Sequence, residues 1–147
     1  MYDGIITKYV AMMNKLLDGP RLSFSKASPS DVRKEPGVYV IFDKRVNAII
    51  YTGRTKDLKR RLLRDHKSGN VRGSQFRKAL QQRFTLKSEK DITDYILENC
   101  SFQFIIIKEF EEMVRLEHFT TAVLAPILNI QLKQSLIKKE NDISIAK

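Results

Sequence analysis

The sequence of 147 residues has very few of the residues that build disulfide frameworks and metal clusters. Cys100 is its single cysteine, His66 and His118 are its two histidines, and tryptophan is absent. These numbers exclude an internal disulfide and argue against a Cys/His zinc site. The longest apolar runs, such as FIII at 104–107, are too short to span a bilayer, and the N-terminal MYDGIITKYV does not resemble a secretory signal. We therefore expect a cytoplasmic protein.

Acidic residues are also scarce along one stretch, from Arg54 to Lys87. This stretch holds twelve basic residues against Asp57 and Asp65, so it accounts for the whole net charge of +10. Such a block is typical of a surface that binds a polyanion, and nucleic acid is the favoured partner. The alternative is a pair of basic helices whose charges are only solvated. The residues that we expect to contact nucleic acid are Arg54, Lys56, Arg60, Arg64, Lys67, Arg72, Arg77 and Lys78.

The apolar pattern predicts an α+β fold, with a small antiparallel sheet of three strands flanked by helices. Two β-branched segments, 38–42 and 48–52, flank the turn residues DKRVN and predict a hairpin. The segment SFQFIIIKEF predicts the third strand because its composition is rich in β-formers. Helices are predicted over 4–18, 56–67, 74–84, 92–99 and 111–124, and in the lysine-rich tail after Ile130.

The sequence also predicts one helix cap and two buried helix stripes. Thr55 is the predicted N-cap of the helix over 56–67, and Leu58 and Leu62 are its predicted buried stripe. In the helix over 111–124, the predicted stripe is Met113, Leu116, Thr120 and Val123.

The hairpin register decides where its two tyrosines lie. A turn centred on Arg45 would place Tyr39 directly opposite Tyr51, on one face of the sheet. A shift of one residue would put the two phenols on opposite faces.

Five segments in order along the chain resemble the GIY-YIG nuclease domain. They are GVY at 37–39, YTG at 51–53, RTKDLKRRL at 54–62, RLEHF at 115–119 and PILN at 126–129. This family supplies the catalytic module of certain homing endonucleases, some restriction enzymes and the C subunit of bacterial nucleotide excision repair. The resemblance implies one domain over 1–147, with a nuclease core over 35–130. The flanks would be an N-terminal helix and connection over 1–34 and a C-terminal tail over 131–147.

The resemblance also implies roles for individual residues. Tyr39 and Tyr51 would position or activate the attacking water, which requires cations to lower a phenol pKa from its usual value near 10. Arg61 would stabilise charge on the phosphate in the transition state. Glu117 would hold one Mg²⁺ or Mn²⁺, since such an ion accepts a single carboxylate when waters and phosphate oxygens complete its shell. Asn129 would support the site.

The sequence departs from the family pattern at two places. Thr52 stands where the second triplet usually has isoleucine, at a position expected to face away from the phenol. The family often has a histidine four residues after the arginine, but here that residue is Asp65, and His66 follows it. Either the helix carries one extra residue, or His66 is a substitute, or the role is absent.

Two functions from different classes compete. The favoured one is a metal-dependent endonuclease that hydrolyses DNA, with RNA left open as a substrate. The alternative is a non-catalytic nucleic-acid-binding module on the same scaffold, and a weaker third is a domain whose basic face binds an acidic protein. Because both flanks are too short for a separate recognition domain, we expect the protein to act on a DNA structure or to be delivered by a protein partner.

Overall fold

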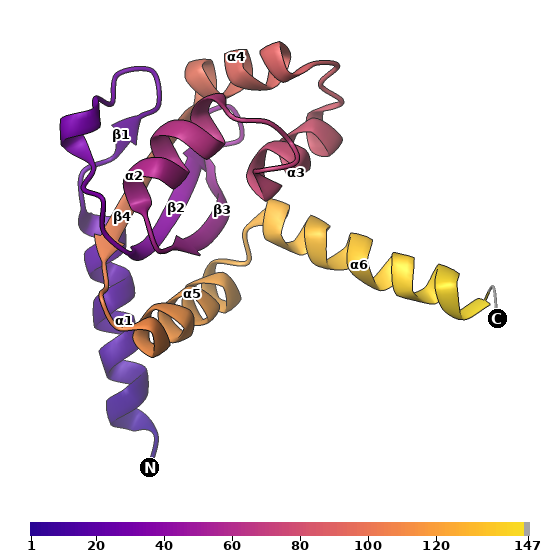
Figure 1. Ribbon diagram of the computed structural model, residues 1–147. Coiled ribbons are helices and arrows are strands. Elements are labelled where there is room, and N and C mark those ends of the chain that lie inside the picture. The colour runs from indigo at the N-terminus through magenta and orange to yellow at the C-terminus, as the bar shows by residue number, and fades with distance from the viewer. Residues whose placement is uncertain (146–147) are drawn as a thin grey trace.

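The computed structural model describes residues 1–145, with side chains described as far as residue 141. At its centre is an antiparallel sheet in the order β1-β4-β2-β3. These strands are Leu22–Ser23, Cys100–Ile106, Gly37–Asp43 and Ala48–Thr55. Helices lie on both faces of the sheet (Figure 1). The α+β class is confirmed, but the predicted number of three strands is wrong. The added strand is β1, which pairs with Ser101 and Phe102 of β4.

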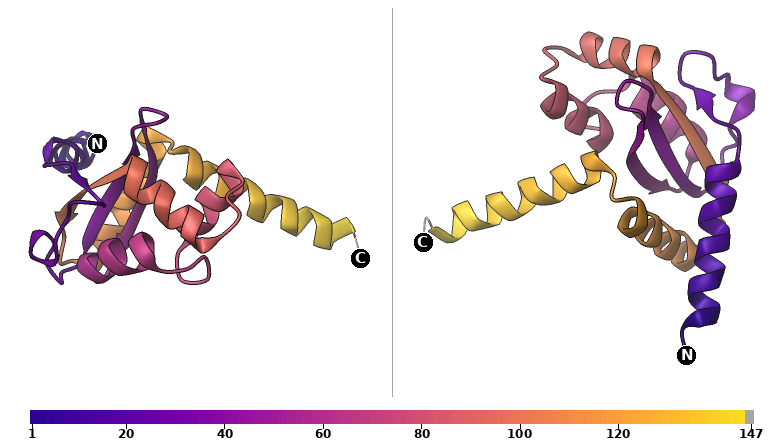
Figure 2. Two further views of the ribbon diagram at one scale, coloured as in Figure 1. Left: turned by 90° about the horizontal axis from the view of Figure 1, so that it is seen from above. Right: turned by 180° about the vertical axis from the view of Figure 1, so that it is seen from behind.

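The central strand β2 divides the core into two layers. Successive side chains of a strand point to opposite faces, and six of the seven residues of β2 are buried. Val38 and Val40 pack in a cluster with residues of α1 (Asp3–Asp18) and α5 (Phe110–Leu124). Tyr39 and Ile41 pack in the other cluster, which includes residues of the helices on the opposite face. Figure 2 shows this layering from two further directions.

The second layer is built from short helices of the basic stretch and the segment after it. They are α2 (Leu58–Arg60), η2 (Arg61–His66), α3 (Gln75–Phe84) and α4 (Glu89–Asn99). Leu58 and Leu62 are fully buried, as predicted. Ser74 caps α3 and Ser88 caps α4, each accepting a backbone N–H of the first turn.

The first basic helix differs from the prediction in its cap and in its winding. Asp57, not Thr55, is the cap, because Asp57 Oδ1 accepts from Arg60 N at 3.0 Å. Thr55 Oγ1 instead accepts from Asp57 N at 3.1 Å, in the turn that precedes the helix. After one turn the helix widens into the π-helix η2, in which each hydrogen bond spans five residues instead of four.

The hairpin register also differs from the prediction. Tyr39 lies opposite Gly53, and Tyr51 lies opposite Ile41. The cause is a bulge, because Phe42 pairs with Ile49 and leaves Ile50 as the extra residue of β3. The offset at the tyrosines is two residues, so both phenols still lie on one face, with ring centroids 6.3 Å apart.

The last two helices carry the remaining parts of the site. Met113, Leu116 and Thr120 of α5 are buried, but Val123 is 54% exposed, so that part of the predicted stripe is wrong. After α5, Ala125 takes a left-handed conformation, and α6 (Ile127–Ile145) begins earlier than predicted. Figure 1 shows α6 extending away from the rest of the protein. The short 3₁₀ helix η1 (Pro29–Asp31) completes the elements.

No helix within residues 1–145 combines the length and the apolar character that a membrane span requires.

Candidate active site

All six residues predicted to be catalytic line one cleft of about 320 Å³. They arrive from five elements, β2, β3, η2, α5 and α6, which are distant in sequence. Among the described residues, the lining is Tyr39, Tyr51, Thr52, Gly53, Arg54, Arg61, His66, Gln75, Glu117 and Asn129.

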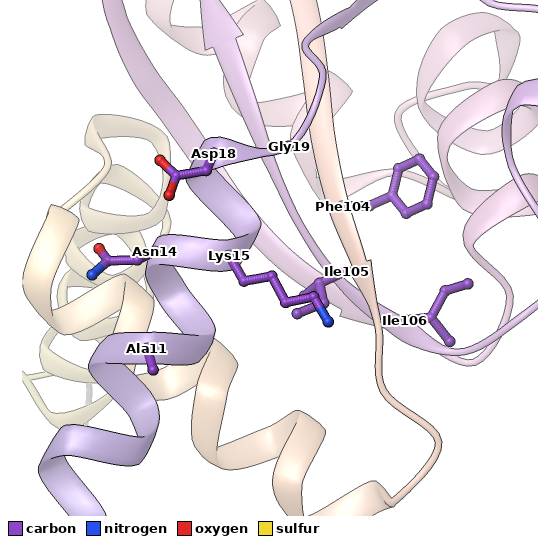
Figure 3. Close-up of a pocket in the computed structure, with 8 residues that line it drawn as sticks. All are labelled: Ala11, Asn14, Lys15, Asp18, Gly19, Phe104, Ile105 and Ile106. Carbon is purple, nitrogen blue, oxygen red and sulfur yellow. The ribbon is translucent and has the colours of Figure 1, made fainter.

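A second and larger hollow of about 890 Å³ lies between α1 and β4 (Figure 3). Its lining includes Lys15 and Asp18 of α1 and Ile105 of β4, but none of the predicted catalytic residues. We place the candidate site in the smaller cleft because phenol, guanidinium, imidazole and carboxylate groups meet there.

Steric constraints explain why the two triplets, at 37–39 and 51–53, each contain a glycine. Gly53 is the cross-strand partner of Tyr39, and a Cβ at Gly53 would collide with the hydroxyl end of the Tyr39 ring. A Cβ at Gly37 would collide with the backbone oxygen of Ile105 on β4. The two glycines therefore let β2 lie close to its neighbour and let the Tyr39 phenol lie across β3.

Tyr39 is hydrogen-bonded to His66, the histidine whose position relative to Arg61 departs from the family pattern. The Tyr39 hydroxyl lies 2.6 Å from His66 Nε2, and both residues are buried. His66 is five residues after Arg61, and η2 is a π-helix over this interval. The wider winding brings residue i+5 to where an α-helix would present residue i+4. The helix thus carries one extra residue, and His66 lies in the cleft beside Tyr39.

Burial controls the ionisation of both phenols. It raises the pKa of Tyr39 well above the usual value, with a further increase from Tyr51. It raises the pKa of Tyr51 to about 12. Arg61 acts in the opposite direction on both groups but does not outweigh the loss of solvation. The condition for a phenol to activate water, a pKa lowered by cations, is therefore not met, and both phenols are neutral near pH 7.

His66 is also neutral near pH 7. Burial, with smaller contributions from Arg61 and Arg77, lowers the pKa of His66 to about 3. Its other ring nitrogen, Nδ1, lies 2.7 Å from the hydroxyl of Ser74. A neutral imidazole has one N–H and one lone pair, so it can link these two hydroxyl groups.

Glu117 is a largely buried carboxylate with the Arg54 guanidinium and the His118 imidazole on one side. Its Oε2 lies 3.2 Å from Arg54 Nη1 and 3.5 Å from His118 Nε2. The side chain is 15% exposed and lines the cleft. In residues 1–145, no three acidic, histidine or cysteine side chains gather as a metal-binding group. One oxygen donor of this kind fits Mg²⁺ or Mn²⁺, which keeps waters and accepts phosphate oxygens, but it does not fit zinc.

Asn129 fixes the backbone of β3 between Tyr51 and Gly53. Its Oδ1 accepts from Thr52 N at 2.9 Å, and its Nδ2 donates to Thr52 O at 3.0 Å. Because β3 is an edge strand, these two backbone groups would otherwise lack a strand partner. Asn129 thus holds the Tyr51–Gly53 segment in place.

Thr52 connects this strand to the helix that carries the carboxylate. Its hydroxyl is hydrogen-bonded to the hydroxyl of Thr121, which in turn donates to the backbone oxygen of Glu117 at 2.7 Å. As predicted, Thr52 points away from the phenols, and a threonine there gains a partner that isoleucine could not have. Thr121 was missed by sequence reasoning, and no local pattern marks it.

Arg61 has few competing contacts. Its Nη1 donates to Gly73 O at 3.4 Å, and its Nε lies 3.8 Å from Asp65. The side chain is 36% exposed at the cleft, so most of its donors are free for an anion. Gln75 is the one cleft residue from α3, and sequence reasoning missed it.

The basic residues expected to contact nucleic acid divide by exposure. Six are exposed and one, Lys67, is partly buried. Arg77 is fully buried and donates to His66 O, Lys67 O and the backbone and carboxylate of Glu89. The prediction that Arg77 contacts nucleic acid is wrong, because the side chain is fully buried and both its Nη1 and Nη2 groups donate to acceptors inside the protein. The six exposed residues are Arg54, Lys56, Arg60, Arg64, Arg72 and Lys78.

A comparison with curated proteins finds no significant match. Among solved structures, the chain resembles two point variants of the GIY-YIG N-terminal endonuclease domain of UvrC from Thermotoga maritima, each bound to a catalytic divalent cation. Both are 22% identical to this chain, with a TM-score of 0.40, and both matches cover 66% of it. They cover 85% and 84% of the respective UvrC chains.

The family model of the GIY-YIG catalytic domain matches residues 8–147, which is nearly the whole chain. The match includes both triplets, the arginine helix, Glu117 and Asn129. The chain therefore belongs to the GIY-YIG catalytic domain family.

Proposed function

We propose that this protein is a divalent-metal-dependent endonuclease that hydrolyses phosphodiester bonds in DNA. Membership of a nuclease family supports the reaction class. The observation that carries the proposal is that Glu117, Arg61, Tyr39 and Tyr51 line one cleft. Exposed basic residues on the adjoining helices support a polyanionic substrate.

The scissile phosphate would bind between the two arginines of the cleft. Arg61 has free donors and would stabilise the charge that develops on the phosphate in the transition state. Arg54 pairs with Glu117 in the absence of substrate, and a phosphate oxygen would offer it a second acceptor. The two guanidinium groups are therefore assigned to substrate binding and charge stabilisation.

Glu117 would hold one Mg²⁺ or Mn²⁺ ion. When bound, the ion would neutralise charge on the phosphate and on the leaving oxygen. Glu117 is the only carboxylate that lines the cleft within the described residues, so we assign the metal-binding role to it alone. The contact between Arg54 and Glu117 holds this carboxylate at the cleft, with Arg54 Nη1 3.2 Å from its Oε2.

The phenols would act as neutral hydrogen-bonding groups. Because both have raised pKa values, neither is a standing phenolate base near pH 7. Hydrogen bonds from Tyr39 and Tyr51 would orient the attacking water and the phosphate, which reduces the entropic part of the barrier. His66 and Asn129 would hold these two phenols in position through the contacts described above.

A comparison of two glutamate variants on α5 tests the proposal. Glu117→Gln should abolish cleavage of labelled DNA in Mg²⁺ while it leaves most of the DNA affinity, because the exposed basic residues are unchanged. Glu111→Gln, an exposed change on the same helix, should cleave like the wild type. Persistent cleavage by purified Glu117→Gln would contradict the metal assignment. If the wild type binds DNA but never cleaves it, the non-catalytic binding module becomes the better account.

Substrate details stay predictions. A preference for a DNA structure, delivery by a protein partner, activity on RNA and a cytoplasmic location all await experiments of their own.

A further inference from the structure

A chain of buried hydrogen bonds runs from the backbone of α3 to the cleft. Ser74 Oγ accepts from Arg77 N at 3.1 Å and lies 2.7 Å from His66 Nδ1. His66 Nε2 lies 2.6 Å from the Tyr39 hydroxyl. The exposed fraction is 1% for both Ser74 and His66, so solvent does not supply alternative partners for the serine hydroxyl or the imidazole. Tyr39 is 2% exposed but lines the cleft, so its phenolic hydrogen can reach a partner there.

The donors and acceptors in this series of hydrogen bonds distinguish the two neutral tautomers of His66. Ser74 Oγ has two partners within the described residues, Arg77 N and His66 Nδ1. If His66 carried its proton on Nδ1, the serine oxygen would accept twice and its own hydrogen would have no acceptor there. A buried polar group without a partner costs about 1–3 kcal/mol. If the proton is on Nε2, the serine donates to Nδ1 and no hydrogen of Ser74 or His66 lacks an acceptor.

We propose that Ser74 is a positioning residue that holds His66 as the Nε2–H tautomer. In this form His66 donates to the Tyr39 oxygen, and the phenolic hydrogen of Tyr39 is free to point into the cleft. The next step rests on the proposed function. The acceptor of that hydrogen is an oxygen of the scissile phosphate. Tyr39 is then a donor to the substrate and does not pass its proton to His66, since Nε2 already carries one.

Arg77 gives this arrangement its rigidity. Its guanidinium donates to the backbone oxygen of His66 at 3.1 Å, and its backbone N–H donates to Ser74. One buried residue thus ties the end of η2 to the start of α3. The distance between the imidazole and the serine hydroxyl is fixed at both of its ends.

Nitrogen-15 NMR of the free protein tests the tautomer without any nuclease assay. Protonated and unprotonated ring nitrogens resonate far apart, and their couplings to the ring carbons' hydrogens distinguish Nδ1 from Nε2. The chain has only two histidines, and His118→Gln assigns the signals by removing one of them. At pH 7 we expect His66 to be neutral with its proton on Nε2. A proton on Nδ1 in the wild type would overturn the proposal.

Two substitutions show which residue sets the tautomer. Ser74→Asp keeps a good helix cap but offers acceptors only, so it should move a proton to Nδ1. Tyr39→Phe keeps Ser74, so His66 should stay protonated on Nε2. If Ser74→Asp leaves Nδ1 unprotonated, or if Tyr39→Phe moves the proton, Ser74 does not set the tautomer. Because Tyr39→Phe preserves the ring volume, it decides the question even if Ser74→Asp does not fold.

Kinetics connect the tautomer to the proposed cleavage. Ser74→Thr, which keeps the hydroxyl, should retain kcat, and Ser74→Asp should lower kcat on the order of a hundredfold, as when one preorganised donor is withdrawn. DNA affinity should change little in either variant. Equal kcat values in the two variants would contradict the role of Tyr39 as a donor. If no variant and no wild type cleaves DNA, the nuclease proposal fails while the NMR result on the tautomer stands.

Discussion

Arg61 and Arg77 come from the same basic stretch but have opposite surroundings. Arg61, on η2, is partly exposed at the cleft, and its polar contacts with the described residues are long, at 3.4 Å and 3.8 Å. Arg77, on α3, is fully buried and donates to backbone and side-chain acceptors of two other segments. A count of charges treats the two as equivalent. The comparison teaches that an arginine is available for phosphate only where protein acceptors have not already occupied its donors.

The strongest test of this contrast is removal of Arg61. Arg61→Ala should lower kcat on the order of a hundredfold or more, because a charge-stabilising donor is lost from the transition state. The free energy of unfolding should change by less than about 0.5 kcal/mol, as at other surface positions. Single-turnover cleavage and urea denaturation measure the two effects, with the exposed Arg83→Ala as the control. An Arg61→Ala protein that cleaves normally would remove the functional half of the comparison.

Removal of Arg77 should have the converse result. Arg77→Ala should lower the free energy of unfolding by about 3 kcal/mol, because several buried carbonyl groups and Glu89 lose their donor. Urea denaturation followed by circular dichroism checks this value. A stable Arg77→Ala protein with weakened DNA binding would show that Arg77 is a phosphate contact after all.

The pH dependence of stability tests the burial of His66, which lies between Arg61 and Arg77 in sequence. Its pKa is about 3 in the folded protein and near 6.5 when unfolded, so the unfolded state takes up the proton first as the pH falls. The contribution of His66 to stability is complete above pH 6.5 and is lost as the pH falls toward 3. Between pH 6.5 and 5 the loss should be about 2 kcal/mol.

Urea denaturation of the wild type and of His66→Gln over this pH range measures that loss. Between pH 6.5 and 5, the free energy of unfolding should fall less for His66→Gln than for the wild type, by about the same 2 kcal/mol. Parallel curves for the two proteins would mean that His66 is not buried in its neutral form.

The smallest effect is expected at Lys78, the neighbour of Arg77 in sequence. Lys78 is exposed, so Lys78→Ala should leave stability unchanged and weaken DNA binding modestly. The slope of log affinity against log salt should fall by about one, as for one phosphate contact. An unchanged salt slope would place the DNA path elsewhere on the basic surface.

Much of the fold could be predicted from the sequence because it depends on local periodicity. Apolar spacing and the proline or glycine that follows predict the helices α1 and α5, β-branched residues predict the strands β2 and β3, and a composition rich in β-formers predicts β4. The hairpin register could not be found in this way, because the bulge at Ile50 depends on how both sheet faces pack. β1 was missed because two residues are too few to show an alternation.

Part of the candidate site could likewise be predicted from the sequence, and part could not. The motif segments identify Tyr39, Tyr51, Arg61, Glu117 and Asn129, and the structure brings all five to one cleft. The π-helix that places His66 was one of three possibilities, since no residue type marks a change of winding. Ser74 could be recognised as a helix cap, but its bond to His66 needed three dimensions. The burial of Arg77 is likewise set by the packing of α3 against its neighbours.

The most direct test is incubation of the wild-type protein with radiolabelled duplex, branched, flapped and single-stranded DNA, with and without Mg²⁺. We expect strand cleavage of at least one of these substrates in Mg²⁺ or Mn²⁺ and none after chelation of the metal. Binding to these substrates without cleavage in either metal would contradict the account of the cleft as a phosphodiesterase site.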